Sequence, residues 1–380
     1  GWMVDTSELF RQGQRADVWA RYCGFIDLSL NEFMEIQRRL LMEQVELLSK
    51  SELGRALFHG QTPNSVDEFR EMVPLNRYGA YAPYLLEQNE EVLPAKPAYW
   101  IHTSGRSGEY RFKWVPVTEG MFKKWSYVGM AGAIFATCLE RGNVALEEND
   151  KFLYCLAPLP YTSGLLAHAV LSEFPFEFMP PVAESERMGF QERIESGFKL
   201  SFRKGLDIFF GLSSVLVRMG EGFAEQSGQM ELSSDLLHPR ALYRIVKALA
   251  TQKLAKRPIL PSDLWDLKGI MSSGMDTVIY KDKIKHYWGK YPLEMYGGSE
   301  FGLIALQAWD YEAMTFVPDL NFLEFIPEEE HLRSRQEPEY QPKTVLLDEV
   351  EAGEVYESVI TNFFGGAFVR DRVGDMVRIT

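Results

Sequence analysis

The chain has 380 residues, of which 46% are hydrophobic and 25% are charged, and its formal net charge is −14. This composition is typical of a soluble globular protein with room for two or three subdomains, and the acidic balance argues against a nucleic-acid partner. Three cysteines are widely separated, and no apolar run reaches the roughly 20 residues that span a bilayer. We therefore expect a cytoplasmic protein that has no membrane span and keeps its cysteines reduced.

The first part of the chain shows helix signals. Ser29 followed by Glu32 forms a capping box, and apolar residues then recur at helical spacing until about Gly54. Ser65 and Glu68 repeat the capping signal for a short helix that ends ahead of Pro74. We interpret these helices as scaffold.

The most informative stretch is Tyr99 to Thr118, which reads Y-W-I-H-T-S-G-R-S-G-E-Y-R-F-K-W-V-P-V-T. Its glycines allow the backbone to turn successive N–H groups inward, and its hydroxyls add further donors. With Lys113 at the far end, the loop suits a polyphosphate. It lacks the G-x-x-x-x-G-K-[ST] spacing of nucleoside triphosphatases, and a polar surface turn is the alternative interpretation.

The middle of the chain alternates between strand and helix signals. Thr118 can cap a long helix that runs to about Arg141 before Gly142. Four strand-like runs follow, K-F-L-Y-C-L, G-L-D-I-F-F, K-G-I-M and L-E-M-Y, with helical stretches such as Pro239 to Gln252 and Thr277 to Tyr287 between them. This alternation predicts an α/β fold with a largely parallel sheet packed between helices, and ligands at the carboxyl ends of its strands.

From Leu303 the pattern changes to short β-like runs: L-I-A-L-Q-A, N-F-L-E-F-I-P, K-T-V-L-L, V-Y-E-S-V-I-T and D-M-V-R-I-T. No long helix separates them, which predicts a small antiparallel barrel or sheet. The charged segment E-E-E-H-L-R-S-R-Q-E-P-E-Y-Q-P between them is expected to be an exposed loop. We therefore divide the chain into an α/β core, 1–302, and a β-rich subdomain, 303–380.

Two further motifs could bind a nucleotide. In Y-G-G-S-E-F-G an aromatic, two glycines, a hydroxyl and a carboxylate follow a strand, at Tyr296, Gly297, Gly298, Ser299 and Glu300. Such a set can stack a base, bind a phosphate oxygen and hold Mg²⁺; a glycine turn that caps the next helix is the alternative. Asp375, after Gly374, can accept hydrogen bonds from ribose hydroxyls, or is an ordinary turn aspartate.

In order and spacing these motifs resemble those of the adenylate-forming superfamily, and within it the auxin-responsive Gretchen Hagen acyl-acid amido synthetases and their bacterial relatives. The loop is similar to T-S-G-T-S-G…K-x-x-P-x-T, and Y-G-G-S-E to Y-x-S-S-E. F-L-E-F-I-P is similar to the E-F-x-P strand, and G-E-V-Y-E-S-V-I-T…F-V-R-D-R-V-G-D to the closing G-x-x-Y-E-x-V-x-T…Y-R-x-G-D segment. The phenylacetate–CoA ligases share several of these signatures.

The resemblance implies that a carboxylic acid and MgATP react to give an acyl-adenylate and pyrophosphate. The acyl group would then pass to an amine of an amino acid, or to a thiol of CoA or a carrier protein. The phosphates would be held by the loop residues Thr103, Ser104, Gly105, Ser107, Gly108 and Lys113. Tyr296 would flank the adenine, with the backbone of Ser273 and Gly274 on its other side. Ser299 would meet the α-phosphate, Glu300 the Mg²⁺ and Asp375 the ribose, so that Lys113, Ser299 and Glu300 form the catalytic set.

The resemblance also implies an acyl pocket and two departures. The pocket would draw on Pro160, Tyr161, Ser163, Gly164, His168 and the segment Phe210, Gly211, Leu212 and Ser213, without a chemical role for His168. Arg106 stands where the family carries a small hydroxyl residue, and it either clamps a phosphate or obstructs one. The family also continues into a small C-terminal domain with a catalytic lysine, so we expect this chain to represent the N-terminal portion without that domain.

Two interpretations from other classes stay open. An acyl-protein synthetase that loads its own cysteine is disfavoured, because no cysteine follows Cys155. A catalytically silent nucleotide-binding protein is compatible with Arg106 and with the missing lysine domain.

Overall fold

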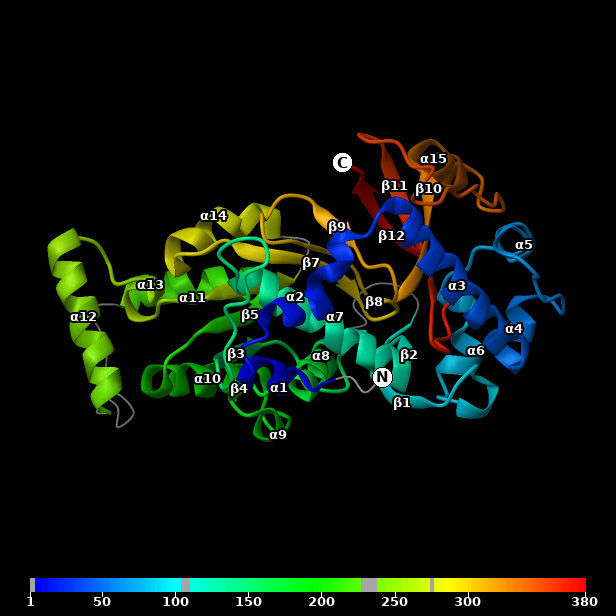
Figure 1. The fold of residues 1–380 in the computed structure, drawn as a ribbon. Coiled ribbons are helices and arrows are strands. Elements are labelled where there is room, and N and C mark those ends of the chain that lie inside the picture. Colours follow the sequence, from blue (N-terminus) through cyan, green and yellow to red (C-terminus); the bar gives the residue numbers. More distant parts are fainter. Residues whose placement is uncertain (1–3, 104–109, 227–237, 274–276) are drawn as a thin grey trace.

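The computed structural model describes residues 4–103, 110–226, 238–273 and 277–380. Within these residues the strands form three sheets, of seven, three and two strands. We call the seven-stranded one the large sheet and the three-stranded one the small sheet. Figure 1 shows the small sheet at one end of the molecule and helix α12 (Pro239–Ala255) at the other.

The large sheet has the order β4-β3-β5-β6-β7-β8-β9. The first five of these strands are parallel, whereas β8 and β9 continue the sheet in antiparallel pairing. The bounds are β3 (Lys151–Cys155), β4 (Glu177–Met179), β5 (Ile208–Leu212), β6 (Gly269–Ser273), β7 (Pro292–Gly298), β8 (Gly302–Gln307) and β9 (Met314–Phe316). The predicted α/β fold with a largely parallel sheet is therefore confirmed.

Side chains alternate between the two faces of the large sheet, and each face packs against its own helices. Phe152 and Tyr154 of β3 join the core beneath α7 (Glu119–Thr137) and α8 (Thr162–Glu173). Leu153 and Cys155 point to the other face, into a core with Leu216 and other residues of the helices that cover that face. Those helices are α10 (Phe190–Lys204), α11 (Ser213–Gln226), α12 and α14 (Thr277–Trp288).

The small sheet is antiparallel and consists of β10 (Asn321–Pro327), β11 (Val355–Asn362) and β12 (Asp371–Arg378). The remaining elements are α1 (Thr6–Arg11), α2 (Arg15–Cys23), α3 (Leu30–Ser49), α4 (Glu52–Leu57), α5 (Val66–Met72), α6 (Ala82–Leu85), β1 (Pro97–His102), β2 (Trp114–Thr118), α9 (Val182–Ser185), α13 (Pro261–Leu264) and α15 (Glu328–Gln336). Strands β1 and β2 pair with each other and flank the glycine-rich loop.

Three predicted helix caps are observed, whereas two helix ends differ from the prediction. The hydroxyls of Ser29, Ser65 and Thr118 each accept a hydrogen bond from a backbone N–H in the first turn of α3, α5 and α7. Helix α3 ends at Ser49 rather than near Gly54, because Ser51 caps the separate helix α4. Helix α7 ends at Thr137 rather than near Arg141, because Cys138 is extended.

The C-terminal third differs from the prediction in three places. Of the charged segment 328–342, which was expected to be a loop, the part Glu328–Gln336 forms α15, with acidic residues in its first turn and arginines in its last, as the helix dipole favours. The run K-T-V-L-L makes only an isolated bridge between Val345 and Phe325. The run L-I-A-L-Q-A forms β8, which pairs with β7 and so belongs to the large sheet rather than to the small one.

Two expectations from composition can be compared with this fold. Among the described residues, no helix combines the length and the apolar character needed to cross a bilayer. All three cysteines of the chain are described, and each is a free thiol.

Buried amide side chains join α3 to the small sheet and its connections. Gln37 donates to the carbonyl oxygens of Pro318 and Asn321, at 2.5 and 2.8 Å, and accepts from the N–H of Leu323 at 2.8 Å. Two helical turns later, Gln44 donates to the carbonyl oxygen of Gly366 and accepts from a neighbouring N–H. Both glutamines are buried, so these hydrogen bonds fix the helix against the sheet without help from water.

We expect Gln37→Met to lower the free energy of unfolding by roughly 2–4 kcal/mol, because it leaves three buried backbone groups without a partner. Chemical unfolding followed by circular dichroism measures the change. Gln191→Met is the matched control, since Gln191 is exposed and its side chain donates to Glu195 one helical turn away. Equal midpoints for Gln37→Met and the wild type would contradict this role of Gln37.

Candidate functional site

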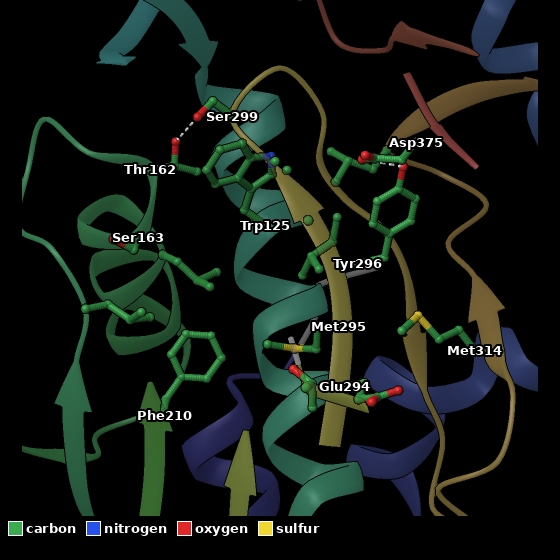
Figure 2. Close-up of a pocket in the computed structure, with 18 of the residues that line it drawn as sticks. Trp125, Thr162, Ser163, Phe210, Glu294, Met295, Tyr296, Ser299, Met314 and Asp375 are labelled. Carbon is green, nitrogen blue, oxygen red and sulfur yellow. Dashed lines mark hydrogen bonds between the residues drawn. The ribbon is translucent and has the colours of Figure 1, made fainter. Parts of the chain in front are cut away.

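A cavity of about 570 Å³ lies where the large sheet meets the small sheet. Its volume is in the range of small-molecule sites. The walls come from α7, the starts of α8 and α14, strands β5, β7, β8, β9 and β12, and adjoining turns. The lining includes Trp125, Leu156, Thr162, Ser163, Leu166, Phe210, Glu294, Met295, Tyr296, Gly297, Gly298, Ser299, Leu303, Met314, Leu320 and Asp375 (Figure 2).

Two predicted nucleotide-binding residues from different sheets meet at this cavity. The hydroxyl of Tyr296, near the end of β7, donates to Asp375 Oδ2 of β12 at 3.0 Å. Burial and the neighbouring carboxylate of Asp375 raise the pKa of the Tyr296 phenol, so it stays protonated and remains a donor. Figure 2 shows this pair on the opposite side of the cavity from Ser299.

Asp375 owes its position to a local irregularity in β12. Val359 of β11 pairs with Arg372, and Glu357 pairs with Met376, so three residues of β12 lie opposite one of β11. Gly374 has a φ of +89° within this bulge, a conformation that residues with a Cβ rarely adopt. The bulge, rather than a turn, places the Asp375 carboxylate in the cavity wall.

Ser299 forms a hydroxyl pair with Thr162, the first residue of α8. Ser299 is buried directly after β7, and both members of the pair line the cavity. A hydroxyl pair at the start of a helix is a suitable place for an anionic oxygen, because the helix dipole adds to the donors. Sequence reasoning missed Thr162, although it lies directly between two residues that were predicted to line the acyl pocket.

Glu300 follows Ser299 and belongs to a cluster of charged groups. Burial raises the pKa of its carboxyl, the charge of Lys113 opposes this shift, and Asp375 adds to it. Burial, and next the charge of Glu300, raise the pKa of the Asp371 carboxyl well above its usual range, while Lys113 and Arg77 oppose the shift. Lys113 therefore acts on both carboxyl groups, and a further cation would stabilise their ionised forms.

The turn that carries Ser299 and Glu300 is fixed by side chains of the small sheet. Asn362 donates to the carbonyl oxygen of Glu300 at 2.9 Å, and Asn321 donates to that of Phe301 at 2.7 Å. Asn362 also donates to the side-chain oxygen of Asn321 at 2.9 Å. Through these bonds the two buried asparagines fix the backbone next to Ser299 and Glu300, two of the predicted catalytic residues.

The glycine-rich loop is described only at its two ends. The N–H of Thr103 donates to the carbonyl oxygen of Lys113 at 3.3 Å, which closes the base of the loop. The Lys113 ammonium lies 5.7 Å from the centre of the Tyr78 ring. The predicted phosphate-binding residues Ser104, Gly105, Arg106, Ser107 and Gly108 lie outside the described residues, as does Gly274. Ser273 is the last residue of β6.

Of the residues predicted for the acyl pocket, Ser163 and Phe210 line the cavity, whereas the others have different surroundings. Pro160 accepts a hydrogen bond from the N–H of His102, and the Tyr161 ring packs against the His102 ring. Gly164 packs against the backbone of Leu159, Gly211 against Cys155, and Leu212 is exposed. The His168 ring forms a hydrogen bond with the Glu186 carboxylate, and the Ser213 hydroxyl bonds to those of Ser272 and Thr277.

Sequence reasoning missed several cavity residues, among them Trp125, Glu294 and Met314. Glu294 lies two residues before Tyr296 on β7, so the period of two in a strand could have found it. Burial raises the pKa of its carboxyl, and the charge of Lys281 opposes this shift. Trp125 and Met314 come from α7 and β9, and no spacing in the sequence relates them to the motif at 296–300.

The raised pKa of Glu300 makes a prediction about stability. A carboxyl with a raised pKa in the folded state stabilises the fold while protonated and loses that contribution as pH rises through the raised value. Glu300→Gln mimics the protonated form, so we expect the variant to be more stable than the wild type, by about 1.4 kcal/mol for each unit of the shift. The advantage should appear above the ordinary carboxyl range and be absent at pH 4.

Thermal unfolding between pH 4 and pH 8, without nucleotide, measures this difference. Glu87→Gln, at an exposed position, is the control and should leave stability nearly unchanged at every pH. A Glu300→Gln variant that is less stable than the wild type at pH 8 would show that the carboxylate stabilises the unliganded fold.

Comparison with known proteins gives the following similarities. The model of the GH3 family N-terminal domain matches residues 23–174, and that of the GH3 family central domain matches residues 314–380. Jasmonoyl–L-amino acid synthetase JAR4 of Nicotiana attenuata is 38% identical over 117 residues, which is 29% of this chain and 19% of that protein. Jasmonoyl–L-amino acid synthetase GH3.5 of Oryza sativa subsp. japonica is 37% identical over 122 residues, 29% of this chain and 20% of that protein.

Two solved structures show the same fold. The acyl acid amido synthetase AtGH3.15 in complex with 2,4-DB superposes with a TM-score of 0.63 at 17% identity, over 91% of this chain and 65% of that chain. 2-Hydroxyisobutyryl-CoA ligase, in complex with 2-HIB-AMP and CoA, gives a TM-score of 0.62 at 12% identity, over 90% of this chain and 64% of that chain. The match to the curated relatives covers about a fifth of their length, and the chain covers less than two thirds of these two structures.

Proposed function

Because this chain belongs to the GH3 family, we propose that it activates a carboxylic acid with MgATP to give an acyl-adenylate and pyrophosphate. The observation that carries this proposal is the cavity at which Tyr296, Ser299 and Asp375, predicted to bind adenine, phosphate and ribose, line one space. In the reaction a carboxylate oxygen bonds to the α-phosphorus, and the bond from that phosphorus to the oxygen of the leaving pyrophosphate breaks. No proton is transferred, so positioning and charge neutralisation supply the catalysis.

The groups around the cavity suit the parts of a nucleotide. The Tyr296 ring offers a face for the base, and the Asp375 carboxylate can accept from ribose hydroxyls in addition to the phenol. The hydroxyls of Thr162 and Ser299 can turn from each other to an α-phosphate oxygen. The Lys113 ammonium would balance phosphate charge at the mouth of the glycine-rich loop.

Glu300 fits a Mg²⁺ ion that arrives with the nucleotide. Mg²⁺ commonly binds one or two protein carboxylates together with phosphate oxygens and water. Within the described part of the chain no cluster of three or more His, Cys, Asp or Glu residues could hold a metal by itself, which agrees with such a shared site. The bound ion would neutralise charge that develops on the phosphates.

The walls of the cavity suit an acid with an apolar body. Leu156, Leu166, Phe210, Met295 and Leu303 line it. For the acceptor we favour an amino acid, because the curated relatives are named as synthetases of jasmonoyl–amino acid conjugates. The alternative is CoA, since a CoA ligase shares the fold.

ATP–pyrophosphate exchange over a panel of carboxylic acids tests the proposed reaction. We expect exchange that depends on both the acid and Mg²⁺. Product analysis with the twenty amino acids and with CoA then distinguishes amide from thioester formation. Tight AMP binding without exchange for any acid would instead indicate a nucleotide-binding protein without this activity.

We expect Tyr296→Ala to weaken AMP binding by roughly 1–3 kcal/mol, the scale of base–aromatic stacking. Tyr296→Phe should keep most of the affinity, because it retains the ring and loses only the hydrogen bond to Asp375. Isothermal titration calorimetry measures both variants, with Tyr243→Ala on the exposed face of α12 as the control. Equal AMP affinity in the wild type and Tyr296→Ala would exclude stacking on this ring.

We expect Glu300→Gln to weaken MgATP binding more than AMP binding, because the substitution keeps the shape of the side chain and removes the charge that faces the ion. Titration of the same protein with MgATP, with metal-free ATP and with AMP measures the difference. An equal loss for all three ligands would mean that Glu300 supports the turn rather than the metal.

A further inference from the structure

Trp125 on α7 has a buried hydrogen-bond donor that the protein itself does not use. Its side chain is 2% exposed, and its indole Nε1 has no hydrogen-bond partner among the described residues. The buried Trp265 and Trp288, by contrast, donate to the carbonyl oxygens of Ser201 and Leu216, at 3.0 and 2.9 Å. Because an unpaired buried donor is costly, the group calls for a partner that is not part of the fold.

The Trp125 side chain lines the end of the cavity where the proposed chemistry takes place. Trp125 lines the cavity together with Thr162 and Ser299, and in the view of Figure 2 its ring lies between that pair and Tyr296. A Cβ on Gly302 would collide with Nε1, so the indole nitrogen stands directly against the turn that follows Ser299. Gly302 also has a φ of +69°. Glycine fits this position because it adopts positive φ without strain and has no Cβ to collide with the indole.

The charges of the cavity lining limit which side chains can bind an anionic ligand. Among the described lining residues the charged groups are the carboxyls of Glu294 and Asp375, with no lysine, arginine or histidine. Among these described lining residues, only neutral donors can bind a carboxylate that enters. The hydroxyls of Thr162 and Ser299 pair with each other and are proposed above to bind the α-phosphate, and the Ser163 hydroxyl donates to the carbonyl oxygen of Ala157 at 3.0 Å.

We propose that the indole N–H of Trp125 donates a hydrogen bond to one carboxylate oxygen of the acid substrate and so binds the acid with its other oxygen free to attack the α-phosphorus. This inference rests on the proposed adenylation reaction. The oxygen bound to Trp125 becomes the carbonyl oxygen of the acyl-adenylate. The carboxylate oxygen is ionised in the acid and becomes a neutral carbonyl oxygen in the acyl-adenylate. A hydrogen bond to an ionised acceptor is about twice as strong as one to a neutral acceptor, so the contact binds the acid more tightly than the acyl-adenylate.

This difference predicts a separation of kinetic constants. In Trp125→Phe the KM for the acid should rise about 10-fold, while kcat and the KM for ATP stay within about twofold of the wild-type values. Trp100→Phe is the matched control, because the Trp100 indole donates to Glu90 at an exposed position outside the cavity. The acid used is the one with the fastest ATP–pyrophosphate exchange in the wild type.

Nuclear magnetic resonance can distinguish a direct hydrogen bond to the acid from an effect of lost packing in the variant. In protein labelled with ¹⁵N at the indole nitrogen, the signal missing from Trp125→Phe identifies Trp125 among the eight tryptophans. Saturation with the acid should move this proton downfield, and AMP alone should not. An unmoved signal, or an unchanged KM for the acid in Trp125→Phe, would overturn the inference. Absence of exchange with every acid in the wild type would overturn the proposed function and this inference with it.

Discussion

The candidate site depends on a set of buried amide hydrogen bonds that link three parts of the molecule. Gln37 joins α3 to the segment that enters β10, Asn321 lies in that strand, and Asn362 connects it to β11. The two asparagines then hold the carbonyl oxygens of Glu300 and Phe301. In a buried setting each of these amides has to be satisfied, so the turn beside the cavity has one arrangement compatible with the rest of the network.

The cavity combines residues that two different sheets support. Tyr296 lies on β7 of the large sheet, and Asp375 depends on the bulge in β12 of the small sheet. The hydrogen bond between Tyr296 and Asp375 spans the two sheets. The length of this hydrogen bond therefore depends on the relative position of the two sheets. The proposed substrate and nucleotide would meet in the space between them.

Much of the fold could be predicted from the sequence, because capping residues and strand-length apolar runs act locally. The caps at Ser29, Ser65 and Thr118 and the parallel strands are of this kind. Helix α15 could not be predicted, because its sequence has almost no aliphatic residues to form a helical pattern. Long-range polar contacts hold it in place instead, such as the hydrogen bond from Arg372 to Ser334 at 3.1 Å. The site motifs at 296–300 and at 375 were visible in the sequence, but Trp125 and the buried amides were not. The amide contacts are long-range, with 20 residues between Asn321 and Phe301 and 286 between Gln37 and Leu323, and no spacing relates Trp125 to the motif at 296–300.

Gly302 illustrates how a residue without any functional group can be indispensable to a site. It stands between the turn after Ser299 and the indole of Trp125, and both its backbone angle and the nearby nitrogen exclude a side chain. Any other amino acid at this position would press the turn and the helix apart. A scan of all substitutions would accordingly rank Gly302 beside the reactive residues, although it contributes no functional group: the absence of a methyl group at this position lets the Trp125 indole pack against the backbone.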